Sequence, residues 1–292
     1  MNLLHVRPPG NPAADCFLEH IELVEHSLTD LGYRPTRSTN DPTSRYNIIF
    51  GAHLMSAAQC AGLSDDNVVF QMEQLPMFMT PHYLDLLRRV TVWDYSERNC
   101  DWLAANGVKK VHYVPFGYNA AMDRIVYPDD TPETRAYDFL FYGAQNQRRR
   151  RIISEWWAND FRVKYIDGGV WGKERDAWIA NAKIVTTIHQ FQDKVAPIHE
   201  MARVFYLMTN RACVLSEVNA DTHIYPWVRE AIVTAPYEDL VKVGTRLAYD
   251  TRMQKDVAAR SYEAIKARPM AATLAALLGH AEQAACDVAG RD

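Results

Sequence analysis

Four arginines stand together in the stretch YGAQNQRRRR, directly after the apolar run DFLFY. Gly143 allows the backbone to turn close to a ligand. The amides at the start of the helix that follows favour an anion. Arg148 and Arg149 can each form two hydrogen bonds with phosphate oxygens. These features predict a phosphate site made of Gly143, Asn146, Arg148 and Arg149.

A solvated helix face is the alternative for this stretch. Four consecutive arginines span a full helical turn, so they cannot all face one ligand. At least two of them should be solvated or paired with acids such as Glu155. The stretch matches neither the G-x-G-x-x-G nor the P-loop pattern, so it is not a standard dinucleotide or ATP fingerprint.

A second polar cluster follows the expected strand KIVTTIH, which ends at His189. Glu200 and Arg203 lie in the next expected helix, three residues apart and therefore on one face. We interpret Glu200 as an acceptor of hydrogen bonds from sugar or ribose hydroxyls. Arg203 then faces a phosphate or pairs with Glu200. The alternative is that Glu200 is a capping or dipole-favoured residue at the helix N-terminus. We assign all three residues to the same donor site as the arginine run.

Three titratable side chains follow strands expected in the first half, and each is a candidate general base. They are His53, Glu73 and Asp94. Asp94 can instead cap the next helix together with Ser96, and His53 can be a turn residue. Glu73 precedes a loop with Pro76, where folding alone gives less reason for an acid.

Tyr118 follows Gly117 in FGYN, after the last strand expected in the first half. Its ring can stack on a sugar or a base, which makes it a candidate acceptor contact. A tyrosine at the edge of the core is the alternative.

Short apolar segments alternate with amphipathic ones along most of the chain. This rhythm predicts parallel strands covered by helices on both faces. The polar, proline-containing segment 119–134 interrupts it and is the expected linker. We therefore predict an α/β protein with two Rossmann-like domains facing a cleft, where ligands bind beyond the carboxyl ends of the strands. The expected parts are a first domain at 1–118, a second at 135–250, and C-terminal helices at 251–292, separated by Pro269.

The strands expected in the first half lie at 2–6, 46–51, 67–72, 89–95 and 110–117, and those of the second at 137–143, 162–167, 183–189, 212–217 and 231–236. Helices are expected at 15–32, 79–89, 96–107, 147–158, 173–181, 198–210 and 237–249.

Composition narrows the class of protein. The 292 residues are 48% hydrophobic with a formal net charge of −4, which is typical of one large or two small globular domains and disfavours nucleic acid as a partner. The five cysteines are scattered without zinc spacing, so we expect reduced thiols, no metal site and a cytoplasmic protein. No apolar stretch has the length of a membrane span, and the N-terminal apolar run is too short for a signal peptide.

The second half resembles the C-terminal domain of GT-B fold glycosyltransferases, in particular the group-1-like branch that includes the CgeB-type proteins. The resemblance covers about residues 137–236 and rests on three stretches in order: FLFYGAQNQRRR, NAKIVTTIHQF and ARVFYLMTNRACVLSE. The first half is similar to a reduced acceptor domain only in its β/α rhythm and linker position.

Two positions depart from that pattern. Tyr206 stands where the family has the Glu of R-V-F-E, which holds the donor ribose, and Asn210–Arg211 replaces a Cys-Gly turn. Glu200 lies upstream and is a candidate substitute for the missing Glu.

The resemblance implies transfer of a sugar from a nucleotide-sugar donor to an acceptor hydroxyl, without a cofactor or bound metal. The implied acceptor is a carbohydrate or glycoconjugate, and the implied setting is bacterial polysaccharide or glycoconjugate synthesis. A GT-B-fold sugar-nucleotide epimerase and a non-catalytic nucleotide-sugar-binding protein are the alternatives, and transfer to DNA bases is disfavoured by the negative charge. The sugar, the nucleotide, the stereochemical outcome, a homodimer and a peripheral membrane contact are left open.

Overall fold

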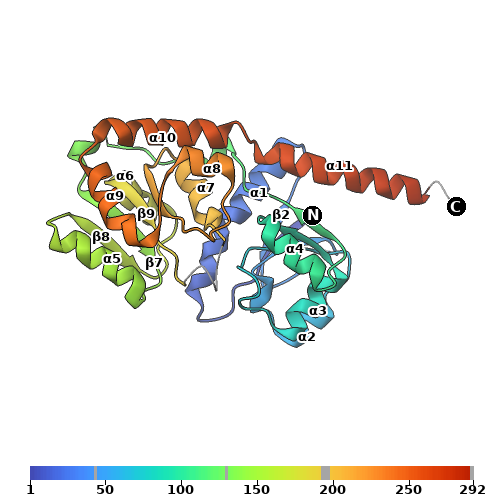
Figure 1. Ribbon diagram of the computed structural model, residues 1–292. Coiled ribbons are helices and arrows are strands. Elements are labelled where there is room, and N and C mark those ends of the chain that lie inside the picture. The colour runs from blue at the N-terminus through green and yellow to red at the C-terminus, as the bar shows by residue number, and fades with distance from the viewer. Residues whose placement is uncertain (43–44, 129–130, 192–197, 290–292) are drawn as a thin grey trace.

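The computed structural model of the chain describes residues 1–42, 45–128, 131–191 and 198–289. The chain forms two α/β lobes, each built on one sheet (Figure 1). Every pair of neighbouring strands is parallel in both sheets. The predicted fold class is therefore confirmed.

The first lobe has the sheet order β2-β1-β3-β4-β5-β6. Its strands are β1 (Asn2–His5), β2 (Thr36–Thr39), β3 (Asn47–Phe50), β4 (Val68–Gln71), β5 (Thr91–Asp94) and β6 (Val111–Tyr113). Its helices are α1 (Leu18–Asp30), α2 (Ala57–Gly62), α3 (Pro81–Arg89) and α4 (Glu97–Ala105).

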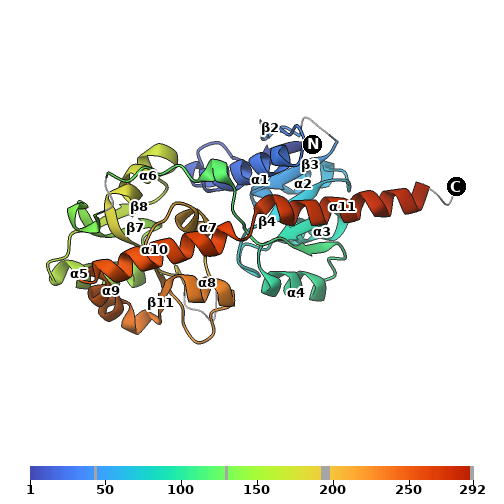
Figure 2. The same cartoon turned by 90° about the horizontal axis from the view of Figure 1, so that it is seen from above.

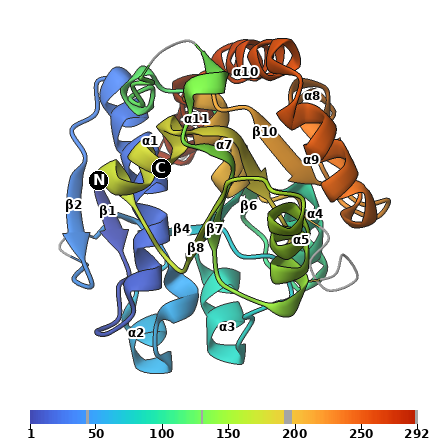
Figure 3. The ribbon, with the colours of Figure 1, turned by 90° about the vertical axis from the view of Figure 1, so that its left-hand side faces the viewer.

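The second lobe has the sheet order β11-β10-β9-β7-β8. Its strands are β7 (Tyr137–Gly143), β8 (Val163–Asp167), β9 (Ala182–Thr187), β10 (Val214–Glu217) and β11 (Val233–Ala235). Its helices are α5 (Gln147–Ala158), α6 (Gly172–Ala180), α7 (Met201–Thr209), α8 (Pro226–Ala231) and α9 (Leu240–Ala248). Figure 3 looks onto this lobe, with α8, α9 and α10 grouped along one side.

The two sheets share one topology, because in each the first strand lies between the second and the third. The strand order reverses beside that first strand, next to β1 in one lobe and β7 in the other. In doubly wound sheets a ligand binds at this reversal, beyond the carboxyl ends of the strands. The topology alone therefore marks the loops after β1 and β3 in one lobe, and after β7 and β9 in the other, as places for a site.

Alternation along the strands divides the core. Leu3 of β1 and Leu140 of β7 belong to an apolar cluster that runs through both lobes. Their neighbours Leu4 and Phe139 point the other way, into clusters that belong to one lobe each. Because both faces of each sheet are covered, the strands read as continuous apolar runs in the sequence.

The C-terminal helices connect the lobes. Helix α10 (Thr251–Lys266) packs on α7 and α8 of the second lobe, and α11 (Met270–Ala289) packs on α1 of the first. Figure 2 shows the pair running across both lobes. The two terminal helices predicted on either side of Pro269 are confirmed. None of the helices in the described ranges is both long enough and apolar enough to span a membrane.

The departure at 210–211 has a structural role. The buried Asn210 side chain accepts hydrogen bonds from the amides of Arg124 and Ile125, both at 2.8 Å. Arg211 has a φ of 55°, in the left-handed region where a glycine is usual, and its guanidinium pairs with Asp123 at 2.6 Å. Both residues therefore hold the segment that joins the two sheets.

Three elements escaped the sequence analysis. The edge strand β2 reads TRST and is mostly exposed, so it lacks the apolar signal of a strand. Helices α2 and α8 have only six residues each, fewer than the two turns needed for a clear period. Every helix and strand that the sequence analysis predicts has a counterpart in the structure, and most of the strands are shorter than predicted.

Candidate active site

A cavity of about 330 Å³ lies between the lobes and is lined by residues of both. It lies at the carboxyl ends of β4, β7, β8 and β9, and two of these strands, β7 and β9, flank the reversal of strand order in the second sheet. Six of the eleven predicted site residues line it: Glu73, Gly143, Arg149, His189, Glu200 and Arg203. The other five, His53, Asp94, Asn146, Arg148 and Tyr118, are not part of the lining.

Gly143 brings two guanidinium groups close to the backbone after β7. It has a φ of 146°, and a Cβ atom there would lie 3.2 Å from Nη2 of Arg203 and 3.7 Å from Nη1 of Arg149. A side chain at this position would crowd the Arg203 guanidinium and would meet Arg149 at an ordinary van der Waals distance, and the φ itself is one that L side chains rarely adopt. The glycine thus leaves room for the two arginines to share one wall of the cavity.

Arg149 is 2% exposed and is held by backbone groups. Its Nε donates to the Ile188 carbonyl at 2.8 Å and its Nη1 donates to the Ala144 carbonyl at 2.9 Å. The Arg149 amide donates to Oδ1 of Asn146, which is the N-cap of α5. Burial lowers the pKa of Arg149 from its ordinary value, although an arginine stays charged. Asn146 therefore shapes the wall, and Arg149 provides its charge.

Arg203 keeps hydrogen-bonding capacity. Its Nη1 is buried and has no hydrogen-bond partner among the residues that the structure describes. Its nearest carboxylate is Glu200, with Nη1 to Oε2 at 3.5 Å, and its guanidinium lies over the Tyr142 ring at 4.9 Å from the ring centre. A cation with an unused buried donor that lines a cavity is suited to an anionic ligand.

Glu200 is the N-cap residue of α7, but its side chain does not cap the helix. The carboxylate points instead to the two arginines, with Oε1 3.2 Å from Nη2 of Arg149. Burial by itself would raise the pKa of Glu200, but Arg203 and Arg149 outweigh burial and hold the pKa below its ordinary value. The side chain thus makes no capping hydrogen bond, although its position at the N-terminus of α7 is one that the helix dipole favours for an acid, and Glu200 is an ionised carboxylate in the cavity wall.

The four arginines of the run have four different surroundings. Arg148 makes a two-pronged ion pair with the fully buried Glu217 and stacks on Tyr237, so it faces away from the cavity. Arg150 is exposed. Arg151 pairs with Glu155 at 3.1 Å, as the sequence analysis expects for at least part of the run. Only Arg149 reaches the cavity, so the expectation that Arg148 faces the ligand does not fit this arrangement.

His189 lines the cavity beside the arginine wall. Its amide donates to Oε2 of Glu217 at 2.9 Å, and its carbonyl accepts from Nη1 of Arg148 at 3.1 Å. The Arg148–Glu217 pair therefore fixes the backbone from which His189 projects.

Glu73 is the acid of the opposite wall, contributed by the first lobe. Its carboxylate is about a quarter exposed, and Oε1 lies 3.6 Å from Nε2 of His53. Burial raises the pKa of Glu73 to about 7 and lowers that of His53 to about 4. At neutral pH the imidazole is uncharged and the carboxyl exchanges its proton readily, which suits a general base.

Asp94 lies behind Glu73. It is fully buried and accepts hydrogen bonds from Ser96, Gln71 and Asn99 at 2.8–3.1 Å. Gln71 and Asn99 in turn donate to the Glu73 carbonyl at 2.6 and 2.9 Å. Asp94 does not reach the cavity, so a role as base does not fit, but its hydrogen bonds position the backbone of Glu73.

Tyr118 lies against the C-terminal helices. Its amide donates to the Arg268 carbonyl at 2.8 Å, its carbonyl accepts from the Met270 amide at 2.8 Å, and its ring packs edge-on against Tyr262. This position does not fit an acceptor contact in the cavity. The alternative of a tyrosine at the core edge describes it.

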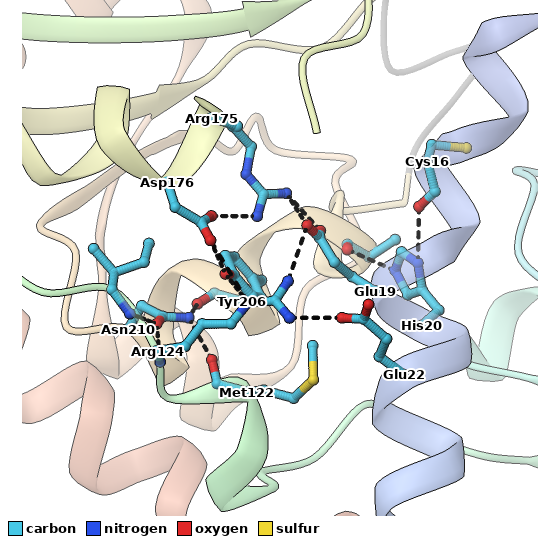
Figure 4. Close-up of polar contacts among 12 residues, drawn as sticks. Cys16, Glu19, His20, Glu22, Met122, Arg124, Arg175, Asp176, Tyr206 and Asn210 are labelled. Carbon is cyan, nitrogen blue, oxygen red and sulfur yellow. Dashed lines mark hydrogen bonds and ion pairs between the residues drawn. The ribbon is translucent and has the colours of Figure 1, made fainter. Parts of the chain in front are cut away.

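Sequence reasoning missed a polar cluster that crosses the cavity edge, drawn in Figure 4. Arg175 of α6 is 2% exposed and donates to Glu19 of α1 at 2.5 Å and to Asp176 at 2.7 Å. Arg124 donates to the Tyr206 hydroxyl at 2.8 Å and to Glu22 at 2.7 Å. Glu19 and Arg175 lie inside helices and carry no motif, and only the approach of the lobes brings them together.

Tyr206 belongs to this cluster and not to the cavity lining. Its hydroxyl donates to Oδ2 of Asp176 at 2.9 Å. Tyr206, at the position where the resemblance implies a ribose-binding Glu, therefore joins α7 to α6. Glu200, the N-cap residue of α7, is a carboxylate that does line the cavity.

A further missed residue is Trp171, in the loop after β8. It lines the cavity, and its indole nitrogen is buried without a hydrogen-bond partner in the described chain. Gly168 and Gly169 precede it in the sequence, a glycine pair directly after a strand that was a usable signal. Across the described ranges, no group of three or more His, Cys, Asp or Glu side chains is placed to hold a metal ion.

Comparison with solved structures identifies the fold. Anabaena HepE in complex with UDP-glucose aligns over 97% of this chain and all of its own, with a TM-score of 0.62 at 12% identity. Sucrose-phosphate synthase from Thermosynechococcus elongatus aligns over the same shares with a TM-score of 0.60 at 12% identity. The chain has the GT-B fold. TarM from S. aureus shares the fold over 92% of this chain and 58% of its own, with a TM-score of 0.54.

Comparison by sequence finds viral relatives of unknown activity. No protein-family profile matches the chain. It is 30% identical over 181 residues to uncharacterized protein L140 of Acanthamoeba polyphaga mimivirus, which is 60% of this chain and 55% of that protein. It is 27% identical over 130 residues to protein L138 of the same virus, 14% of that protein's length. The chain thus spans about half of the first relative and a small part of the second, and the CgeB-type subgroup stays a prediction.

Proposed function

We propose that the chain is a glycosyltransferase that moves a sugar from a nucleoside-diphosphate sugar to an acceptor hydroxyl. The observation that carries the proposal is one cavity of the GT-B fold with two unlike walls. Gly143, Arg149 and Arg203 form a cationic wall on the second lobe, and Glu73 faces it from the first. HepE, which has the same fold, is solved with UDP and glucose and with UDP-glucose.

The cationic wall is where we place the donor's diphosphate. Arg149 and Arg203 carry two positive charges against the single negative charge of Glu200, so the wall has a surplus cation. The unused donor of Arg203 and the preformed backbone support of Arg149 need little rearrangement. Such fixed charges stabilise the negative charge that develops on a departing phosphate.

The positions proposed for the diphosphate and for Glu73 define the course of the reaction. The oxygen of the acceptor hydroxyl forms a bond to the anomeric carbon of the donor sugar, and the bond between that carbon and the phosphate oxygen breaks. The electron pair of the broken bond leaves with the nucleoside diphosphate, and the hydroxyl proton passes to Glu73. The same walls serve an inverting or a retaining course, and in a retaining course the leaving phosphate can take the proton instead.

The finer parts of the proposal come from the family resemblance. We propose that donor binding needs no metal, because guanidinium groups take the place of a cation. We also propose the cytoplasm as the location and bacterial polysaccharide or glycoconjugate synthesis as the setting. The donor's sugar and base are not assigned.

Calorimetric titration tests the donor site. UDP, GDP, CMP and dTDP are titrated with EDTA present into wild type, Arg203→Ala and Arg150→Ala. The Arg150 variant is the matched control, because it removes the same charge from an exposed position of the arginine run. We expect one nucleotide to bind, Arg203→Ala to weaken it, and Arg150→Ala to leave it unchanged. Binding that depends on Arg150 and not on Arg203, or no binding at all, would refute the proposal.

A non-catalytic nucleotide-sugar-binding protein is the second candidate, and Tyr206 favours it. The hydroxyl of Tyr206 is engaged with Asp176 and Arg124, so it does not replace the ribose-binding Glu. This candidate shares the nucleotide binding but predicts no release of sugar. An assay for hydrolysis or transfer with the sugar nucleotide of the bound base separates the two.

A further inference from the structure

The first-lobe wall of the cavity is mainly apolar. Besides four polar residues, it consists of Cys16, Phe17, Met72, Met77, Phe78 and Tyr95. Methionines and aromatic rings give an adaptable surface that favours apolar ligand groups. The second-lobe wall, with its arginines, is of the opposite kind.

Two of the four polar residues on this wall are held by protein groups, and a third, Gln74, is held through its oxygen alone. Glu19 is bound to Arg175 at 2.5 Å. Both ring nitrogens of His20 face backbone carbonyls, Cys16 at 3.1 Å and Ala202 at 2.8 Å. The amide oxygen of Gln74 accepts from the Ile198 amide at 3.3 Å. Glu19 and His20 therefore have little capacity left for a ligand, while the side-chain amide nitrogen of Gln74 donates to no group among the described residues.

Glu73 is the remaining polar residue. Among the described residues its carboxylate has one close polar neighbour, His53 at 3.6 Å, which is beyond hydrogen-bonding distance. The first-lobe wall thus offers one available acidic group and one side-chain amide in a mainly apolar surface. A ligand with many hydroxyls would replace few of the hydrogen bonds to water that it loses here.

Phe78 provides a second, independent observation that favours a ligand contact on the first-lobe wall. Its φ is 60°, a backbone conformation that is costly for a residue with a large side chain. Its side chain is 58% exposed and yet lines the cavity. A strained backbone that keeps an aromatic ring at a cavity, without burying it in the core, indicates a contact with a ligand.

We propose that the acceptor has an apolar body, aromatic or aliphatic, that lies on Phe78, Met77 and Met72, and a hydroxyl that reaches Glu73. This proposal rests on the proposed glycosyltransferase function and names the class of its second substrate. The apolar body docks on the first lobe while the donor diphosphate lies on the second. A glycoconjugate with an apolar aglycone fits this description, and a free polysaccharide end does not.

Acceptor binding is measured with two ligands that carry the same sugar hydroxyls. Phenyl β-D-glucoside and glucose are titrated into the protein loaded with the nucleoside diphosphate that it binds. We expect the phenyl glucoside to bind at least about tenfold more tightly, because its ring can cover the apolar wall. Equal binding, tighter binding of glucose, or binding of neither ligand to the nucleotide-loaded protein would overturn the acceptor proposal.

Substitutions test whether the first-lobe wall causes the difference in affinity between phenyl glucoside and glucose. Phe78→Gly removes the ring and relieves the positive φ, so this variant should fold at least as stably as wild type. It should reduce the preference for the phenyl glucoside to about threefold or less, and leave nucleotide affinity unchanged. Tyr249→Ala removes another exposed aromatic side chain, distant from the cavity lining, and should keep the preference. A preference that survives Phe78→Gly would contradict the assigned wall.

The nucleotide titration distinguishes failure of the proposed function from failure of the acceptor proposal alone. If no nucleoside diphosphate binds, the proposed function fails. If a nucleotide binds and the acceptor preference is absent, only the acceptor proposal fails.

Discussion

Two arginine clusters lie between the lobes, and they differ in the ratio of guanidinium groups to carboxylates. The bridging cluster joins Arg124 and Arg175 to Glu19, Glu22 and Asp176, with Tyr206 between them (Figure 4). It holds three carboxylates for two guanidinium groups. The cavity cluster, in contrast, consists of Arg149, Arg203 and Glu200, with two guanidinium groups for one carboxylate.

Hydrogen-bond distances show the same difference. In the bridging cluster the contacts of Arg175 and Arg124 to carboxylates and to the Tyr206 hydroxyl include four at 2.5–2.8 Å. In the cavity cluster the arginine–carboxylate contacts are 3.2 and 3.5 Å, and one donor of Arg203 is unused. Both clusters contain a buried guanidinium nitrogen without a hydrogen-bond partner among the described residues, Nε of Arg175 and Nη1 of Arg203. The clusters therefore differ in charge and in contact length: compensated charges in close contact hold two parts of the fold together, while a surplus positive charge can bind an anion.

The largest expected effect comes from breaking the bridging cluster. Arg175→Met keeps most of the side-chain volume and leaves Glu19 and Asp176 without their partner. We expect a loss of about 3 kcal/mol in the free energy of unfolding, because buried charges lose their compensation. Urea denaturation measures it. The double variant Arg175→Met/Glu19→Gln should recover part of the loss, and full stability of the single variant would contradict a structural role.

Breaking the cavity cluster should affect binding and not stability. Arg203→Ala removes the surplus cation, and we expect nucleotide affinity to fall about 30-fold, which corresponds to ~2 kcal/mol for a charged hydrogen-bonding group. Calorimetry gives the affinity and denaturation the stability. A variant that unfolds easily but binds with unchanged affinity would place Arg203 with the structural arginines.

We predict that the ionised Glu73 carboxylate lowers the stability of the folded protein at neutral and alkaline pH. Its pKa in the folded state is about 7, above the ordinary value of about 4.5, so the folded protein binds this proton more tightly than the unfolded chain. The stabilisation by that proton is complete below pH 4.5 and is lost as the pH rises through 7. Glu73→Gln should therefore be more stable than wild type by about 1–2 kcal/mol at pH 8, with little difference at pH 4.

Activity should show the opposite dependence on Glu73. In an inverting course the ionised carboxylate is the base, so transfer by the wild type should increase between pH 6 and 8. Glu73→Gln should lose about 100-fold or more of the rate and this pH dependence. Unchanged transfer by the variant would remove Glu73 from the reaction.

The smallest effect is expected at the surface of the arginine run. Arg151 pairs with Glu155 in an exposed i,i+4 arrangement. Arg151→Ala should change stability by less than about 0.5 kcal/mol and nucleotide affinity not measurably. A large effect on affinity would show that the run acts as a whole, against the distinction between its four members.

The fold was largely predictable from local patterns, because each buried parallel strand is a short apolar run and each covering helix is amphipathic. Polar residues after strands were informative for the same reason. Parallel strands bring their carboxyl ends to one edge of a sheet, so Gly143 and His189 could be expected near each other, and Glu73 was expected at the edge of the other sheet across the predicted cleft. The exposed strand β2 carries neither signal and was missed.

The side-chain directions were not predictable. Arg148 and Arg149 are neighbours in the sequence, yet one turns to Glu217 and the other to the cavity. Asp94 and Glu73 both lie at the carboxyl ends of strands, but the Asp94 carboxylate accepts hydrogen bonds from Ser96, Gln71 and Asn99 and does not reach the cavity. Glu19 and Arg175 come from helices of different lobes, 156 residues apart, and only the packed lobes place them together.

The most direct test of the donor wall is a crystal structure of the chain with the nucleoside diphosphate that calorimetry selects. We predict the diphosphate beside Gly143, with its oxygens within hydrogen-bonding distance of Arg203 and Arg149, and the bridging cluster unchanged. A diphosphate held by Arg150 and Arg151 on the outer face of α5, or one that displaces Glu19 from Arg175, would contradict the distinction between the two clusters.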